Sequence, residues 1–129
     1  MDCDVLVVDD YSAIRKILQR MLRQTGLGIG NVYGADDGLQ ALELLKIHKV
    51  DVILTDVIMP NMDGMELLAA VKASPQWRHI PILLVTTEGS ESKVSEAVRL
   101  GASGYVRKPF TADQIKEKLA GILAAQRQA

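Results

Sequence analysis

Cysteine, aromatic residues and long apolar runs are all scarce in this chain. Its 129 residues include a single cysteine, Cys3, so no disulfide can form within the chain. No apolar run approaches the roughly 20 residues that a membrane-spanning helix needs. Nor does an apolar stretch of the signal-peptide kind follow the first residues. These absences exclude a disulfide scaffold and predict a protein of the reducing cytoplasm with no membrane partner.

An excess of one charge is lacking as well. Lysine and arginine number 15 against 16 aspartates and glutamates, which leaves a formal net charge of −1. Without a strongly basic balance, the sequence predicts no long-range attraction to nucleic acid or to an anionic membrane. The length suits one domain of ordinary size, and no linker composition interrupts it. We expect residues 1–129 to form a single domain without an output domain, acting as a monomer.

Short apolar runs alternate with longer segments of helical pattern, which is typical of βαβ units around a parallel sheet. Three of the runs are apolar throughout, as expected for central strands that helices cover on both faces. The predicted strands are residues 5–8, 31–35, 52–55, 82–85 and 104–107. The sequence therefore predicts an α/β fold with a doubly wound, five-stranded parallel sheet.

Helix signals fill the segments between the strands. Three pairs have the spacing of a capping box, in which side chains satisfy free amides of the first turn. They predict helices beginning near residues 38, 64 and 112, and the pairs are Asp37 with Gln40, Asp63 with Glu66 and Thr111 with Gln114. The first helix is marked by apolar residues at helical spacing: Ile14, Ile17, Leu18, Met21 and Leu22. A weaker pattern after the fourth strand stops at Gly101, a predicted C-terminal cap.

Charged side chains stand just past the ends of three predicted strands. Asp9 and Asp10 follow the first strand, Asp56 the third and Lys108 the fifth. Ligands of open α/β sheets bind at the carboxyl edge, so these four side chains are expected to converge there. An aspartate in such a place is, taken singly, more often a helix cap. It is the combination of carboxylates from two strands that favours a site.

Carboxylates held a few ångströms apart repel one another and raise their pKa values unless a cation lies among them. Mg²⁺ prefers oxygen ligands and leaves positions for water and phosphate, which predicts a Mg²⁺ site at Asp9, Asp10 and Asp56. Asp56 is the candidate nucleophile toward phosphorus, and Lys108 would neutralise charge that develops during transfer. Thr86 closes the fourth strand, where its hydroxyl can donate to a phosphoryl oxygen or cap the following turn.

Four segments form a joint motif in a fixed order. They are Val7-Val8-Asp9-Asp10-Tyr11-Ser12, Asp56 with residues 59–64, Val85-Thr86-Thr87-Glu88, and residues 101–110, which include Lys108-Pro109. In order and spacing this motif resembles the receiver domain of bacterial two-component response regulators, and most of all its stand-alone chemotaxis members. The likeness covers essentially the whole chain. It implies a flavodoxin-like (βα)5 fold with strand order 2-1-3-4-5.

The resemblance also implies a function, which is a phosphorylation-controlled signalling switch rather than an enzyme in its own right. A histidine kinase would supply the phosphoryl group, and a downstream effector protein, such as the flagellar motor switch, would read it. The implied roles are metal-site acid for Asp9 and Asp10, phosphoacceptor for Asp56, phosphoryl sensor for Thr86 and Lys108, and aromatic switch for Tyr105.

One position departs from the pattern of the chemotaxis members. Two residues after Asp56 stands Ile58, where those proteins carry a polar side chain beside the path of attacking water. The backbone carbonyl of Ile58 can still ligate the metal, but its side chain predicts a longer phosphoryl lifetime. Glu88 is the second position expected to tune that lifetime.

Two other functions remain as alternatives. A Mg²⁺-dependent aspartyl-phosphate phosphatase would carry an aspartate at the position of Ile58. A flavodoxin-like cofactor carrier would have a Ser/Thr/Gly-rich first loop where this chain has Asp9, Asp10 and Tyr11. Both are disfavoured by these residues.

Overall fold

Five parallel strands alternate with five helices in the part of the chain that the computed structural model describes, residues 2–87 and 91–127. The strands are β1 (Cys3–Val8), β2 (Ile29–Ala35), β3 (Val52–Asp56), β4 (Ile82–Thr86) and β5 (Gly104–Arg107). They form one sheet in the order β2-β1-β3-β4-β5. Every neighbouring pair is parallel, which confirms the predicted flavodoxin-like order. Glu88 lies outside the described residues.

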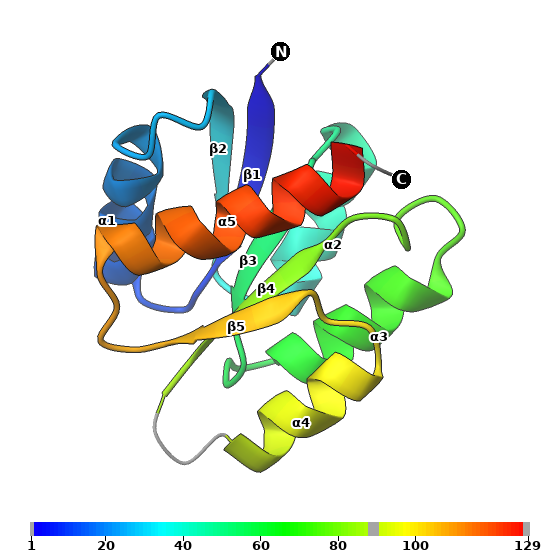
Figure 1. Ribbon diagram of the computed structural model, residues 1–129. Helices are drawn as coiled ribbons and strands as arrows, with labels where there is room; N and C mark the ends of the chain where they lie inside the picture. The colour runs from blue at the N-terminus through cyan, green and yellow to red at the C-terminus, as the bar shows by residue number, and fades with distance from the viewer. Residues whose placement is uncertain (1, 88–90, 128–129) are drawn as a thin grey trace.

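Helices cover both faces of the sheet, as Figure 1 shows. They are α1 (Ser12–Arg23), α2 (Gly38–Ile47), α3 (Gly64–Ala73), α4 (Glu91–Arg99) and α5 (Ala112–Arg127). α1 and α5 lie on one face, and α2, α3 and α4 lie on the other. None of the described helices is long and apolar enough to cross a membrane.

The central strands each contain a continuous apolar run because both of their faces are covered. In β1, Val5 and Val7 belong to the apolar cluster that contains residues of α1 and α5. Leu6 and Val8 belong to the opposite cluster, with residues of α2 and α3. All four are at most 1% exposed. Successive side chains of the strand thus pack alternately into two separate cores, one on each face, as expected for a doubly wound sheet.

The helix starts follow the predicted caps closely. Asp63 and Glu66 form a complete capping box at α3. Thr111 and Gln114 make the same two reciprocal hydrogen bonds before α5. At α2 the expected box is only half formed. Asp37 accepts from the Gln40 amide, but the Gln40 side chain bonds the backbone and carboxylate of Asp36, so it does not reach the Asp37 amide.

Three other details correct or complete the sequence prediction. β1 and β2 each begin two residues earlier than predicted, because backbone pairing of Cys3 with Ile29 extends the ladder past the apolar run. Ile17, counted with the buried stripe of α1, is 40% exposed at the border of that stripe. Gly101 does follow the end of α4 with a left-handed φ of +114°, as a C-terminal cap requires.

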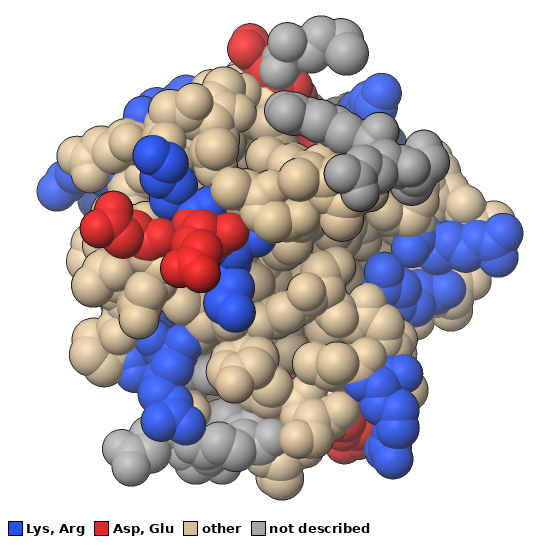
Figure 2. Space-filling model, in the orientation of Figure 1, with Lys and Arg blue, Asp and Glu red and all other residues tan. Residues whose placement is uncertain are grey.

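The surface matches the balanced composition. On the face seen in Figure 2, basic and acidic side chains are scattered over a largely uncharged surface and form no extended patch of one sign. This face therefore carries no sign of a site for a polyanion.

Candidate functional site

The predicted site residues gather at the carboxyl edge of the sheet. Asp9 follows β1 directly, Asp56 is the last residue of β3, and Lys108 follows β5. β1 and β3 are parallel neighbours, and Val8 lies opposite Thr55. The next residue in each chain segment is an aspartate, so Asp9 and Asp56 emerge side by side. The sheet order therefore explains why residues 47 positions apart in sequence share one site.

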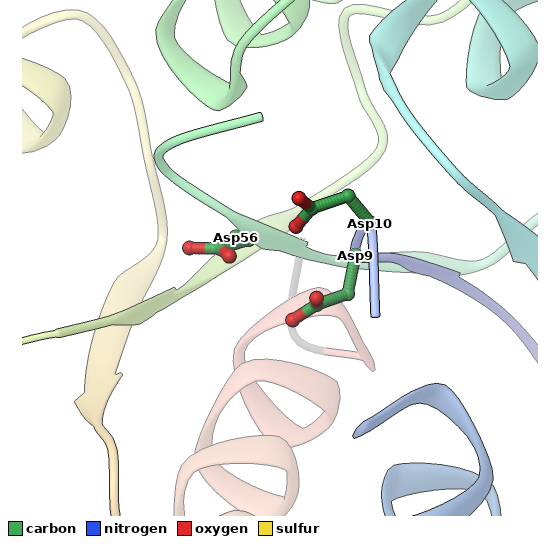
Figure 3. Close-up of side chains that lie close together, drawn as sticks. All are labelled: Asp9, Asp10 and Asp56. Carbon is green, nitrogen blue, oxygen red and sulfur yellow. The ribbon is translucent and has the colours of Figure 1, made fainter. Parts of the chain in front are cut away.

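Three carboxylates form the acidic part of this site. One oxygen each from Asp9, Asp10 and Asp56 lies within 4.8 Å of the others. Figure 3 shows the side chains of Asp9 and Asp10, which leave the end of β1, beside Asp56 at the end of β3. Asp9 and Asp56 are buried, whereas Asp10 is exposed. This set of oxygen ligands, open to water at Asp10, fits a hard divalent cation.

Lys108 bridges the two buried carboxylates. Its Nζ donates to Oδ2 of Asp9 at 2.9 Å and to Oδ2 of Asp56 at 3.2 Å. These two ion pairs offset the repulsion between the aspartates, which lie close together with little solvent around them. The peptide bond between Lys108 and Pro109 is cis.

Backbone amides hold the other oxygen of each buried carboxylate. The Tyr11 amide donates to Oδ1 of Asp9 at 2.9 Å. The amides of Val57 and Ile58 donate to Oδ1 of Asp56 at 2.7 and 3.4 Å. Both carboxylates are therefore held in one orientation before any ligand arrives, which is the preorganisation that a reactive site requires.

The environment shifts two of the pKa values. Burial raises the pKa of Asp56 above its ordinary value of 3.8; the charge of Lys108 opposes this shift and the charge of Asp9 adds to it. Burial alone would lower the pKa of Lys108, but its hydrogen bonds and charge interactions with Asp9 and Asp56 together hold it above 10.5. Lys108 is thus a cation at neutral pH. A further positive charge nearby would stabilise the ionised form of Asp56.

Comparison with known proteins gives a consistent result. The family model of the response regulator receiver domain matches residues 5–120. The chain belongs to this family. Over 115 residues it is 44% identical to chemotaxis protein CheY-3 of Vibrio cholerae, covering 89% of this chain and 87% of that protein. It is also 44% identical to chemotaxis protein CheY of Pseudomonas aeruginosa, over 89% of this chain and 91% of the relative.

Solved receiver structures share the fold. The chemotaxis response regulator CheY4 of Vibrio cholerae superimposes with a TM-score of 0.79 at 37% identity, over 97% of this chain and 98% of that one. The receiver domain of AraT from Geobacillus stearothermophilus gives 0.89 at 30% identity, over 99% and 98%. The chain is accordingly a CheY-type receiver, a module of phosphorylation-controlled signalling and not a classic enzyme.

Three predicted residues of this receiver lie around the acidic cluster rather than in it. Ile58 follows the nucleophile candidate with its side chain 57% exposed. Thr86 ends β4 opposite Arg107 in the ladder. Its side chain is outside the described part of the structure. Tyr105, in β5, is 46% exposed, with the Nζ of Lys118 5.9 Å from the centre of its ring.

Two positions of the receiver were missed by the sequence reasoning. Nη1 of Arg15 donates to the backbone carbonyl of Asp9 and pairs with Asp36 at 2.9 Å. The turn that carries Asp9 and Asp10 is thus tied to the loop after β2. A long polar side chain in the first turn of α1 was a weak signal for this contact, because many surface residues share that pattern.

Gly64 is the second missed position. A Cβ atom there would lie 2.2 Å from the Asp56 carbonyl oxygen, so only glycine allows α3 to start this close to the end of β3. The Gly64 amide also donates to the Val57 carbonyl at 2.8 Å. Its place in the motif was visible in the sequence, but its steric reason was not.

Proposed function

We propose that this receiver accepts a phosphoryl group on Asp56 with Mg²⁺ bound by Asp9, Asp10, Asp56 and the backbone carbonyl of Ile58. The observation that carries the proposal is the position of Lys108. Its ammonium group bridges Asp9 and Asp56 beside a third carboxylate, which pairs a fixed cation with an all-oxygen set of ligands. Phosphoryl transfer is accelerated by positive charge placed against the oxygens of the transferred group.

In this reaction a carboxylate oxygen of Asp56 forms a bond to phosphorus. The bond between phosphorus and the imidazole nitrogen of a phosphohistidine breaks, and its electron pair stays on the imidazole, which takes up a proton. When bound, Mg²⁺ supplies positive charge to the phosphoryl oxygens. Lys108 exchanges its contact with Asp56 for one with the phosphoryl group, and the amides of Val57 and Ile58 keep the carboxylate in place.

The donor in this scheme is a histidine kinase, and the reader is an effector protein. Both relatives at 44% identity are named chemotaxis proteins, which supports a chemosensory effector such as the flagellar motor switch. The receiver itself would catalyse only its own phosphorylation and slow dephosphorylation. The isoleucine at position 58 argues against the phosphatase alternative, which needs an aspartate there. A monomeric state, a cytoplasmic location and a chain without an output domain stay predictions.

Labelling with a small phosphodonor tests the phosphoacceptor and the metal together. Acetyl phosphate with Mg²⁺ should add one phosphoryl group to the wild type, seen as a mass shift. Labelling should disappear in Asp56→Asn and in the presence of a chelator. Asp63→Asn is the matched control, because Asp63 caps α3 on the same loop and should remain without effect on labelling. Undiminished labelling of Asp56→Asn would refute the assignment.

The readout of phosphorylation would run through Thr86 and Tyr105. A dianionic group on Asp56 would draw the Thr86 hydroxyl, and the Tyr105 ring would enter the space behind it. Tyr105 starts half exposed beside Lys118, so its inward movement would change the surface formed by β5 and α5. Such coupling changes partner affinity by about 5–150-fold.

Beryllofluoride, which mimics the phosphoryl group, tests this readout. Amide chemical shifts should change in residues 100–110 and in α4 as well as at the site. Shifts confined to the neighbourhood of Asp56 would rule the switch out.

A further inference from the structure

The loop between β3 and α3 is fastened to the start of α2. This helix follows β2, which is the edge strand at the other end of the sheet from β5 and Lys108. Nδ2 of Asn61 donates to Oδ2 of Asp37 at 2.7 Å. The Gly38 amide donates to the Met62 carbonyl at 3.0 Å. A Cβ atom on Gly38 would lie 2.5 Å from Cγ of Met62, so the two segments are in close contact. The loop after Asp56 is therefore held at its middle by a neighbouring loop.

Asp37 does more than cap a helix. Its Oδ1 accepts from the Gln40 amide at 2.9 Å, which is the cap of α2. A cap needs one oxygen only, and here the second oxygen accepts from Asn61. The side chain is buried, and the hydrogen bond from Asn61, followed by that of the Gln40 amide, holds its pKa below 3.8. Asp37 is thus an ionised acceptor shared between α2 and the loop.

Asn61 takes up an unusual backbone conformation to reach this partner. Its φ is +65°, the only left-handed value at a non-glycine position among the described residues. Asparagine tolerates this region better than most residues, but the surroundings must hold it there. The hydrogen bond to Asp37 is a direct means of holding it.

The fastened loop carries the backbone of the candidate site. Its first residues, Val57 and Ile58, donate their amides to Oδ1 of Asp56. The Gly64 amide fixes the Val57 carbonyl. Only Met59 and Pro60 lie between Ile58 and Asn61, so this short segment is held at both ends, near Asp56 at one end and at Asp37 at the other. Release of the second end would loosen the amides and the carbonyl of Ile58.

We propose that Asp37 and Asn61 are positioning residues of the metal site, acting through the loop of residues 57–62. The proposal rests on the proposed function, since it assigns the pair a role toward the same cation. An open cavity of about 580 Å³ has Asp10, Asp37 and Asn61 in its lining. Within residues 2–87 and 91–127, neither Asp37 nor Asn61 forms a hydrogen bond with a side chain of the predicted metal ligands, so the pair acts by holding the loop.

Two single variants break the contact while sparing the rest. Asn61→Gly removes the amide donor and accepts a positive φ, and Asp37→Ser keeps a capping oxygen for α2 but loses the oxygen that Asn61 uses. Each should weaken Mg²⁺ binding about tenfold, the lower range for residues that orient metal ligands. Mg²⁺ titrations read from the amide shifts of Val57 and Ile58 measure this in the folded protein.

A reciprocal exchange supplies the decisive comparison. In the double variant Asp37→Asn with Asn61→Asp, the donor and the acceptor change places, the net charge is kept and position 37 can still cap α2. Mg²⁺ affinity should return towards the wild-type value. Thr25→Ala is the matched control for a general loss of stability, because it removes a buried hydroxyl bonded to the Leu22 carbonyl at the C-terminal end of α1. Its Mg²⁺ affinity should not change.

The outcomes separate this proposal from the proposed function. Wild-type affinity in Asn61→Gly and Asp37→Ser would overturn the positioning role and leave the Mg²⁺ site intact. Weak binding that the double variant does not restore, or equal weakening in Thr25→Ala, would overturn it as well. If the wild type itself shows no Mg²⁺-dependent shifts, the metal site fails and the positioning role fails with it.

Discussion

Asp37 and Asp56 are both buried aspartates, at 5% and 7% exposure, yet their pKa values move in opposite directions. Hydrogen bonds from Asn61 and the Gln40 amide lower that of Asp37. Burial raises that of Asp56, in spite of Lys108. Although the exposed fractions are similar, burial is the leading cause of the pKa shift only at Asp56, whereas hydrogen bonds outweigh it at Asp37.

The difference lies in what surrounds the two carboxylates. Asp37 has a neutral donor for each oxygen and stabilises the fold as an ion. Asp56 has another carboxylate beside it and shares its one lysine with Asp9. A structural aspartate is satisfied within the protein, whereas the candidate phosphoacceptor is left short of positive charge. This is the arrangement expected where a cation and a phosphoryl group are to bind.

Of the changes proposed here, removal of Lys108 should have the largest effect, because it takes away the only cation that pairs with Asp56 among the described residues. Lys108→Met keeps an apolar stem but leaves Asp9 and Asp56 buried without a counter-charge, so the free energy of unfolding should fall by about 3 kcal/mol. Urea denaturation at neutral pH measures the loss. Lys46→Met is the control, because its pair with Glu43 is largely exposed and should contribute less than about 0.5 kcal/mol. Equal losses in the two variants would show that burial does not strengthen the Lys108 pairs.

The second prediction concerns the access of water to phosphorylated Asp56, a reaction for which Asp37 has no counterpart. In Ile58→Asn a polar side chain can orient the attacking water, so the phosphoprotein should decay about fivefold faster, the effect of one hydrogen bond of about 1 kcal/mol. Loss of the phosphoryl mass after removal of the donor gives the rate. Ile47→Asn changes an equally apolar, exposed residue at the end of α2 and should leave the rate unchanged. An unaltered rate in Ile58→Asn would contradict the role of this side chain.

The pH dependence of stability tests the comparison directly, with a smaller effect. For Asp56 the folded pKa is raised, so the unfolded chain ionises first and stability falls as pH rises from 3.8 through the folded value. Asp56→Asn should therefore be more stable than the wild type at neutral pH. The gain should vanish in acid, below the unfolded pKa. Urea denaturation over a pH series measures the gap, and a gap that widens in acid would contradict the raised pKa.

Asp37 should give the opposite sign. Its folded pKa is lowered, so its contribution is present above 3.8 and is lost as pH falls through the folded value. Asp37→Ser should be less stable than the wild type at neutral pH by about 1 kcal/mol, and the two should converge in acid. A difference that does not depend on pH would mean that Asp37 stabilises the fold without its charge.

The sequence by itself determined the elements and the place of the site. Apolar runs of four or five residues are covered on both faces, so their hydrophobicity marks them as strands. Capping pairs such as Asp63 and Glu66 act over three residues, so the start of α3 could be read locally. Parallel strands send their carboxyl ends to one edge, and this put Asp9, Asp56 and Lys108 together in advance.

Only the tertiary structure decided how these groups are connected. Lys108 meets Asp9 and Asp56 across 99 and 52 positions of sequence. Asn61 reaches Asp37 across 24. Each contact depends on where two loops come to lie, and the loops are placed by packing of the helices and strands that they join. No local sequence pattern records that packing. Only the packing therefore distinguishes Asp37, whose charge is satisfied by hydrogen bonds, from Asp56, which is left short of positive charge.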